Sequence, residues 1–237
     1  MKLKFAAVFL LLFPLLLSAQ DVLRGAVKIE LMPVYGAYMD EEYPLEKDTA
    51  YRRALEEAAL FFSAQIYGWS FHYDIGERAR GIEEVFDLTP LGEIRWGDSG
   101  LNVTHAHFEN RDFRFTSHQL ADVLTVWFDY RPTPPQASRL EMWKKGNIRT
   151  AQAVGYGPLG GPADNSGWLE IKKHTLEDSA RAAVRAMLQG SEKNRPKQAT
   201  GFICLQTFPS YWMDAGRWAT QARFRVEITE IIPFSAY

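Results

Sequence analysis

A long alternation of apolar and polar side chains near the C-terminus constrains the fold of this chain more than any other feature. The mostly apolar half of this alternation is Trp218, Thr220, Ala222, Phe224, Val226, Ile228 and Glu230. A period of two residues is typical of a strand that buries one face. A second apolar run covers 200–208, and the turn-forming residues Asp214-Ala215-Gly216 lie between the two runs. We therefore expect strands over 200–208 and 218–232 that pair as antiparallel neighbours.

Two alanine-rich segments have the spacing of amphipathic helices. Apolar side chains recur every three or four residues from about residue 48 to residue 65, and again from about 176 to 190. The strands predicted around them are 26–35 and 66–73 for the first helix, and 168–172 and 200–208 for the second. These β-α-β and β-α-β-β units predict an α+β fold, with two principal helices on a mainly antiparallel sheet.

The middle of the chain predicts short elements and a division into two halves. The elements are a short helix over 79–86 and strands over 101–108, 112–116 and 123–130. Prolines in Arg131–Pro135 and glycines in Gly155–Gly167 predict breaks in regular structure, the second a long loop. The expected organisation is an N-terminal unit over 20–131, a connection over 132–167 and a C-terminal unit over 168–237, packed together as one domain.

The N-terminus has the layout of a cleavable secretory signal peptide. Lys2 and Lys4 supply positive charge, an apolar run covers 5–17, and small residues precede a cleavage point after Ala19. The rival interpretation is a membrane anchor. A spanning helix needs about 20 apolar residues, whereas this run is shorter and is interrupted by Pro14. We therefore interpret 1–19 as a signal peptide and expect a periplasmic or extracellular protein, without stable membrane insertion after cleavage.

Composition favours a globular protein that is stabilised by its core. Apolar residues make up 46% of the chain, enough for a packed interior. Loss of Lys2 and Lys4 with the signal takes the formal net charge from −2 to −4, so there is no basic excess for nucleic-acid binding. Cys204 is the only cysteine, which excludes an intramolecular disulfide. Its apolar neighbours Ile203 and Leu205 predict a buried, unreactive thiol.

The sequence carries no motif that predicts a cofactor. Gly155–Gly161 is rich in glycine, but prolines follow and no helix begins at once, as a dinucleotide fingerprint requires. A G-x-S-x-G nucleophile elbow is also absent from the sequence. We therefore expect no cofactor.

Three histidines are the best candidates for a metal site. His105 and His107 are two residues apart on a predicted strand, so both imidazoles point to the same face. His72 lies on another predicted strand, and Asp74 or Glu109 could supply a carboxylate. The alternative is that these histidines are structural or solvated, because the sequence has no Cys/His cluster and no helical H-E-x-x-H motif.

Tryptophan is abundant, with seven in the chain. Exposed aromatic rings stack on sugars or anchor protein partners. Trp96 lies beside a glycine and Trp212 beside a predicted turn, so these two are the candidates for contact with a partner or glycan. Trp69 and Trp127 fall inside strand patterns and are expected in the core.

Several segments resemble uncharacterised exported spirochaete envelope proteins. These segments are Ala54–Ala58 running into Ile66–Tyr73, Arg195–Lys197 leading to Gly201–Ile203, and Asp214–Arg217. The resemblance implies a double-membrane bacterial envelope but no activity and no catalytic residues. Ala153–Gly157 and the helix around Ala180 are also similar, at the level of fold alone, to bacterial envelope domains of the SIMPL kind.

These features favour a non-catalytic exported protein that binds or assembles with another envelope component, either a protein or a glycan. The alternative is a small envelope enzyme, metal-dependent or hydrolytic, centred on His72, His105 and His107.

Overall fold

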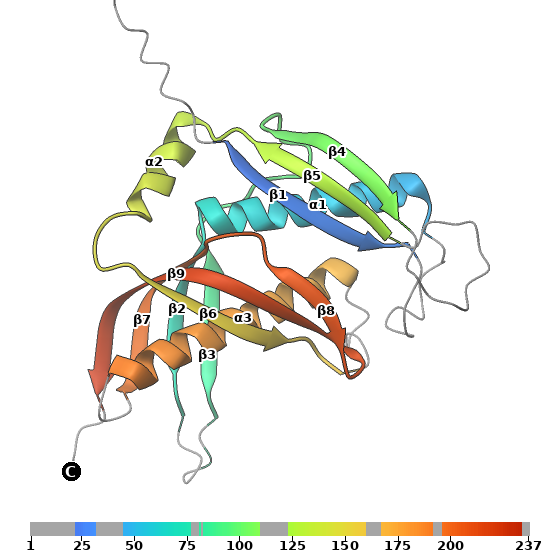
Figure 1. Ribbon diagram of the computed structural model, residues 1–237. Coiled ribbons are helices and arrows are strands. Elements are labelled where there is room, and N and C mark those ends of the chain that lie inside the picture. Colours follow the sequence, from blue (N-terminus) through green and yellow to red (C-terminus); the bar gives the residue numbers. More distant parts are fainter. Residues whose placement is uncertain are drawn as a thin grey trace, which may run out of the picture.

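The computed structural model describes residues 22–31, 45–76, 81, 83–109, 123–159, 167–191 and 196–233. These residues form three helices and nine strands (Figure 1). In chain order they are β1 (Leu23–Glu30), α1 (Lys47–Ile66), β2 (Trp69–Asp74), β3 (Val85–Pro90), β4 (Leu101–Glu109), β5 (Val123–Tyr130), α2 (Pro134–Met142), β6 (Arg149–Tyr156), α3 (Trp168–Ser191), β7 (Pro196–Leu205), β8 (Ser210–Asp214) and β9 (Arg217–Pro233). The expected signal peptide over 1–19 and the expected strand over 112–116 lie outside the described residues.

Sheet A has three strands in the order β1-β5-β4, and both pairings are antiparallel. The register of β1 on β5 runs without interruption from Leu23 opposite Tyr130 to Glu30 opposite Val123. On the other side of β5, the pairing with β4 shifts between Val103 and His105. Such a bulge bends and twists the bulged strand, so the two edges of sheet A differ in regularity.

Sheet B follows the order β3-β2-β7-β9-β6, and β8 also pairs with β9. The predicted C-terminal strand is confirmed as β9, whose antiparallel neighbour β7 places Leu205 opposite Phe224. Phe224 and Val226 are fully buried whereas Arg223 is exposed, so β9 buries one face as the alternation predicts. The strands of sheet B come from both halves of the chain, because β2 and β3 belong to the same sheet as β6 and β7.

The helices lie between and beside the sheets. α1 contacts β1 and β5 of sheet A and β7 of sheet B, so it is packed between the two sheets (Figure 1). Phe62 of α1 stacks on Tyr130 of sheet A at 5.3 Å between ring centroids. Phe61 stacks on Tyr211 of sheet B at 5.9 Å. α3 covers β6 and β9, and both helices therefore share the buried face of sheet B.

The α+β class, the antiparallel pairing and the two alanine-rich helices are confirmed, but the expected strand over 168–172 is wrong. α3 begins at Trp168 and includes this segment. Trp168, Ile171 and Leu176 are all buried, and their spacing places them on the face of α3 that also buries Ala180. The segment thus continues the helical period instead of starting a strand.

Two further expectations in the middle of the chain are wrong, and one holds in part. Val85 and Phe86 begin β3 and do not end a helix. The break expected at Arg131–Pro135 is present over 131–133, but α2 begins at Pro134, where the prolines occupy the first helical positions at which a missing N–H costs nothing. The backbone N–H of Thr133 donates to Gln136 Oε1 at 2.8 Å and secures this start. Gly155 lies in β6, so the loop predicted from that residue begins later.

Candidate functional site

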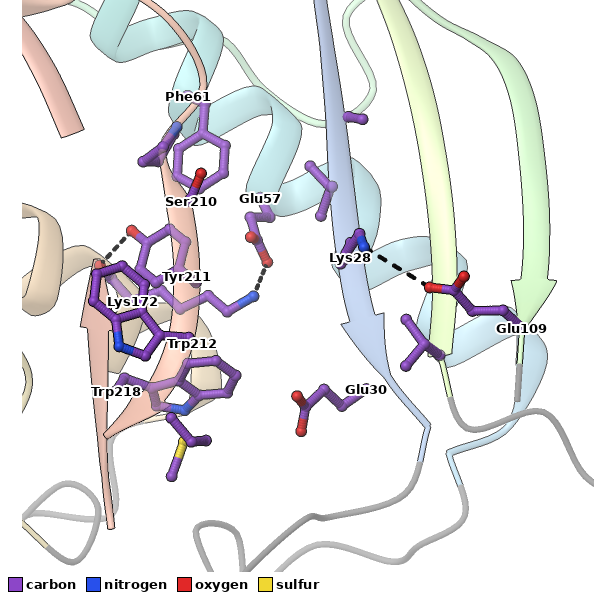
Figure 2. Close-up of a pocket in the computed structure, with 15 residues that line it drawn as sticks. Lys28, Glu30, Glu57, Phe61, Glu109, Lys172, Ser210, Tyr211, Trp212 and Trp218 are labelled. Carbon is purple, nitrogen blue, oxygen red and sulfur yellow. Dashed lines mark hydrogen bonds and ion pairs between the residues drawn. The ribbon is translucent and has the colours of Figure 1, made fainter. Parts of the chain in front are cut away.

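A cleft lies where the edge of sheet A faces the edge of sheet B. It encloses about 610 Å³, a typical volume for a binding pocket. β1 supplies one wall with Ala26 and Lys28, and β8 supplies the other with Tyr211 and Trp212. The floor is made by α1 and α3 (Figure 2). The cleft therefore collects residues from elements that are remote in sequence.

Phe208 packs against Gly25 of β1, next to the cleft-lining residues Ala26 and Pro209. A Cβ atom on Gly25 would come within 2.3 Å of the Phe208 ring, so only glycine admits this contact. The ring also packs on Phe61 and Phe62 of α1, at 5.1 and 4.7 Å between centroids. From this contact, β1 continues from Ala26 and β8 begins at Ser210, so the two strands run along the cleft in the same direction (Figure 1).

An ion pair between α1 and α3 forms the cleft floor. Lys172 Nζ lies 2.6 Å from Glu57 Oε2, and the two side chains are 5% and 3% exposed. Burial raises the pKa of Glu57 above its ordinary value, and the neighbouring ammonium limits that rise. Because each charge is almost completely removed from water, each requires the other as its partner.

Aromatic rings surround the lysine of this pair. Lys172 Nζ lies 5.6 Å from the ring centroid of Trp168 and 5.3 Å from those of Tyr211 and Trp218. These distances permit cation–π attraction. The Tyr211 hydroxyl donates to the backbone carbonyl of Lys172 at 2.9 Å, and burial raises the pKa of Tyr211. The hydroxyl therefore stays protonated, and the aromatic wall of β8 is fixed to the start of α3.

The mouth of the cleft is more exposed and carries weaker interactions. Lys28 Nζ lies 3.8 Å from Glu109 Oε1, and both side chains are open to solvent (Figure 2). Such surface pairs contribute little to stability. Trp212 is 38% exposed and lines the cleft. The site thus combines a dry charged floor with an aromatic and charged rim.

Trp96 lies at a second depression, away from this cleft. It is 52% exposed and shares a hollow of about 810 Å³ with Leu60 of α1 and Leu169 of α3. The two tryptophans that sequence analysis selects are both exposed, but they line different cavities. Trp69 is buried as expected. Trp127 is 37% exposed, because its side chain lies on one face of β5 while those of Val126 and Phe128 lie on the other face and pack toward α1.

The structure separates the three candidate histidines. His72 is on β2 of sheet B, whereas His105 and His107 are on β4 of sheet A. The His105 ring packs against Trp127 at 5.0 Å. In the part of the chain that the structure describes, no group of three or more His, Cys, Asp or Glu side chains is placed to hold a metal ion.

The two carboxylates proposed as partners for these histidines have other contacts. Asp74 accepts a hydrogen bond from Gln198 Nε2 at 2.9 Å, and Glu109 pairs with Lys28. The expected burial of Cys204 is confirmed, and burial raises the pKa of its thiol to about 12. Its low reactivity stays a prediction.

Sequence analysis missed Glu57 and Lys172, although each interrupts an apolar helical face. Glu57 lies between Ala54 and Phe61, which are both buried. Lys172 is next to buried Ile171. A charged residue within an apolar stripe indicates a buried pair, and this was the available signal. That Glu57 pairs with Lys172 follows only from the packing of α1 on α3.

Comparison with known proteins gives relatives but no established activity. Within the described residues, no helix is both long enough and apolar enough to cross a membrane. No solved structure matches the chain, so the likeness to SIMPL domains stays a prediction. An uncharacterized protein of Treponema pallidum (strain Nichols) is 22% identical over 182 residues, which cover 77% of this chain and 69% of the relative. A family model matches residues 13–234. The chain therefore belongs to this uncharacterised family of spirochaete proteins.

Proposed function

We propose that this protein is an exported, non-catalytic binding module of the cell envelope, and that its ligand occupies the cleft between β1 and β8. The observation that carries the proposal is the cleft itself. A volume of about 610 Å³ with an aromatic wall on the β8 side suits recognition, because Tyr and Trp offer large contact areas at low entropic cost.

The charges of the floor support binding and not proton transfer. Glu57 and Lys172 form a mutual pair at 2.6 Å and are nearly inaccessible. A general acid or base must reach the proton that it transfers, whereas these two groups are directed at each other. Their role in this proposal is to fix α1 against α3 beneath the ligand.

The proposal of export depends on the N-terminal sequence. The charged start and apolar run over 1–19 have the layout of a signal peptide. Protein recovered from its host is expected to begin at or near Gln20, as N-terminal sequencing would determine. An N-terminus at Met1 would contradict this part of the proposal.

Site-specific photo-crosslinking in living cells tests the cleft as the binding site. A photo-reactive amino acid at Trp212 is expected to capture an envelope component in a defined adduct. The matched control is the same amino acid at Ala186, an exposed position of α3 outside the cleft lining. Ala186 lies fourteen residues from Lys172, or about 21 Å along the helix. Equal adducts from both positions, or none from Trp212, would contradict the proposal.

The alternative enzyme hypothesis makes a separate prediction. A metal enzyme centred on His72, His105 and His107 requires bound metal in the purified protein. Elemental analysis measures this directly. Stoichiometric zinc or another transition metal, lost on His105→Ala, would overturn the non-catalytic proposal.

A further inference from the structure

We infer that the ligand of this cleft is an extended peptide segment of a partner protein, which adds as a strand between β1 and β8. The inference rests on the proposed function and specifies the chemistry of its ligand. The peptide runs antiparallel to both strands and directs alternate apolar side chains toward α1. It carries a basic residue among the side chains that point outward.

Both walls of the cleft are sheet edges. In the described part of the chain, β1 pairs with β5 and β8 pairs with β9, and each strand ends its sheet on the side of the cleft. An edge strand presents backbone N–H and C=O groups in the order that another strand can pair with. Strand addition is an established mode of peptide recognition. A glycan would not reproduce this regular sequence of donors and acceptors.

The direction of the two edges fits a single added strand. β1 and β8 run the same way from the contact between Gly25 and Phe208. A peptide antiparallel to one is therefore antiparallel to the other. Because both sheets are antiparallel throughout, such a peptide continues both patterns, in the order β4-β5-β1-peptide-β8-β9.

These two edges carry neither a bulge nor a proline. β4 carries a bulge between Val103 and His105, and β3 ends at Pro90; bulges and prolines both discourage edge pairing. The registers of β1 and β8 are uninterrupted, from Leu23 to Glu30 and from Ser210 to Asp214. A regular edge therefore lies on each side of the cleft.

The side chains around the gap define what the peptide must present. Inward-facing positions meet Phe61 and the aromatic rings of β8, above an ion pair whose charges are already matched. Apolar peptide side chains suit this surface. The rim carries the Lys28–Glu109 pair and the exposed ring of Trp212. The face of an exposed tryptophan ring attracts a cation, which favours a basic residue pointing outward.

The test uses a displayed library of random heptapeptides and the purified full chain. Selection is made on the wild-type protein, with counter-selection on Ala26→Trp, which fills the cleft from an exposed position of β1. Ala186→Trp is the matched control and is expected to bind as wild type does. We expect the recovered peptides to alternate apolar with polar residues and to be enriched in Lys or Arg.

Two measurements on a recovered peptide identify strand addition. N-methylation of alternate backbone amides removes donors without changing side chains, and is expected to weaken binding at least about tenfold. Hydrogen exchange of the protein is expected to slow in 26–30 and 210–213 on binding, and to stay unchanged in β4.

Each other outcome overturns the inference. Peptides that tolerate N-methylation, or that protect β4, bind by a different mode. Slower exchange of β1 and β8 with rising concentration of the protein alone would identify a second copy as the occupant. A library without binders, together with a glycan adduct at Trp212, would reject the peptide and leave the proposed function intact. Absence of both peptide binding and any adduct at Trp212 would reject the proposed function as well.

Discussion

Replacement of Lys172 by Met should be among the most destabilising single changes in this protein. Methionine keeps most of the volume of the side chain but leaves the Glu57 carboxylate, 3% exposed, without its partner. Breaking a buried ion pair in this way costs about 3–5 kcal/mol, against a total stability of about 5–15 kcal/mol for a typical domain. For a chain of this size, the loss corresponds to a fall in Tm of about 6–20 °C.

The neighbouring residue provides a matched control. Lys173 Nζ lies 3.3 Å from Glu170 Oε1, but both side chains are more than one-third exposed. Lys173→Met should therefore cost no more than about 1 kcal/mol. The double variant Glu57→Leu with Lys172→Met should recover most of the loss, because it replaces the buried pair with apolar groups. Urea denaturation measures all three variants at constant pH.

The loss should also depend on pH. Burial raises the folded-state pKa of Glu57 above its ordinary 4.5, so the folded state binds the proton more tightly than the unfolded state. The stability that the Glu57 carboxyl group contributes is present below about pH 4.5 and is lost as the pH rises through its folded-state pKa. Without Lys172 the fall extends further, because the ammonium no longer favours the carboxylate. Equal stabilities of Lys172→Met and Lys173→Met at pH 7 would refute this account of the floor.

Three further predictions concern the core and the thiol. Phe224→Asp places a charge in a fully buried position of β9 and should prevent stable folding at 25 °C. Arg223 is exposed, so Arg223→Ala should change the free energy of unfolding by less than about 0.5 kcal/mol. Comparable losses of stability in the two variants would contradict the assigned faces of β9. Gly155→Ala would bring a Cβ atom within 2.1 Å of the Ser179 backbone nitrogen and should cost about 1–3 kcal/mol. Gly97→Ala, with no atom within 4 Å, should be neutral in the same denaturation experiment, and a neutral Gly155→Ala would count against the close packing of α3 on β6. Cys204, with a pKa raised to about 12 by burial, should react slowly with a thiol reagent at pH 8 and rapidly in denaturant, so equal rates in the two conditions would show that the strand is accessible.

A helix or strand can be predicted from the sequence when the apolar residues of its buried face recur with a constant period over many residues. β9 extends over seventeen residues, enough for its alternation to be distinct. β6 was missed because its side of the contact with α3 is built from small residues, including Ala151, Ala153 and Gly155, which give little hydrophobic contrast. The start of α3 was missed because five residues do not separate a period of two from a period of 3.6.

The site could be predicted only in part. Trp212 was identified because its neighbours are typical of a turn at the surface. Glu57 and Lys172 are 115 residues apart, and no local pattern relates them. Their contact depends on how α1 and α3 pack within the layer of helices, which is a property of the whole fold. The same holds for the cleft, whose walls belong to two different sheets.

The most direct test of the cleft as the binding site combines the crosslinker at Trp212 with the substitution that fills the cleft. Ala26→Trp should abolish the Trp212 adduct in cells, while the Tm of the variant stays close to that of the wild type because position 26 is exposed. Ala186→Trp should leave the adduct unchanged. An adduct of undiminished yield in folded Ala26→Trp protein would contradict the claim that the ligand lies between β1 and β8.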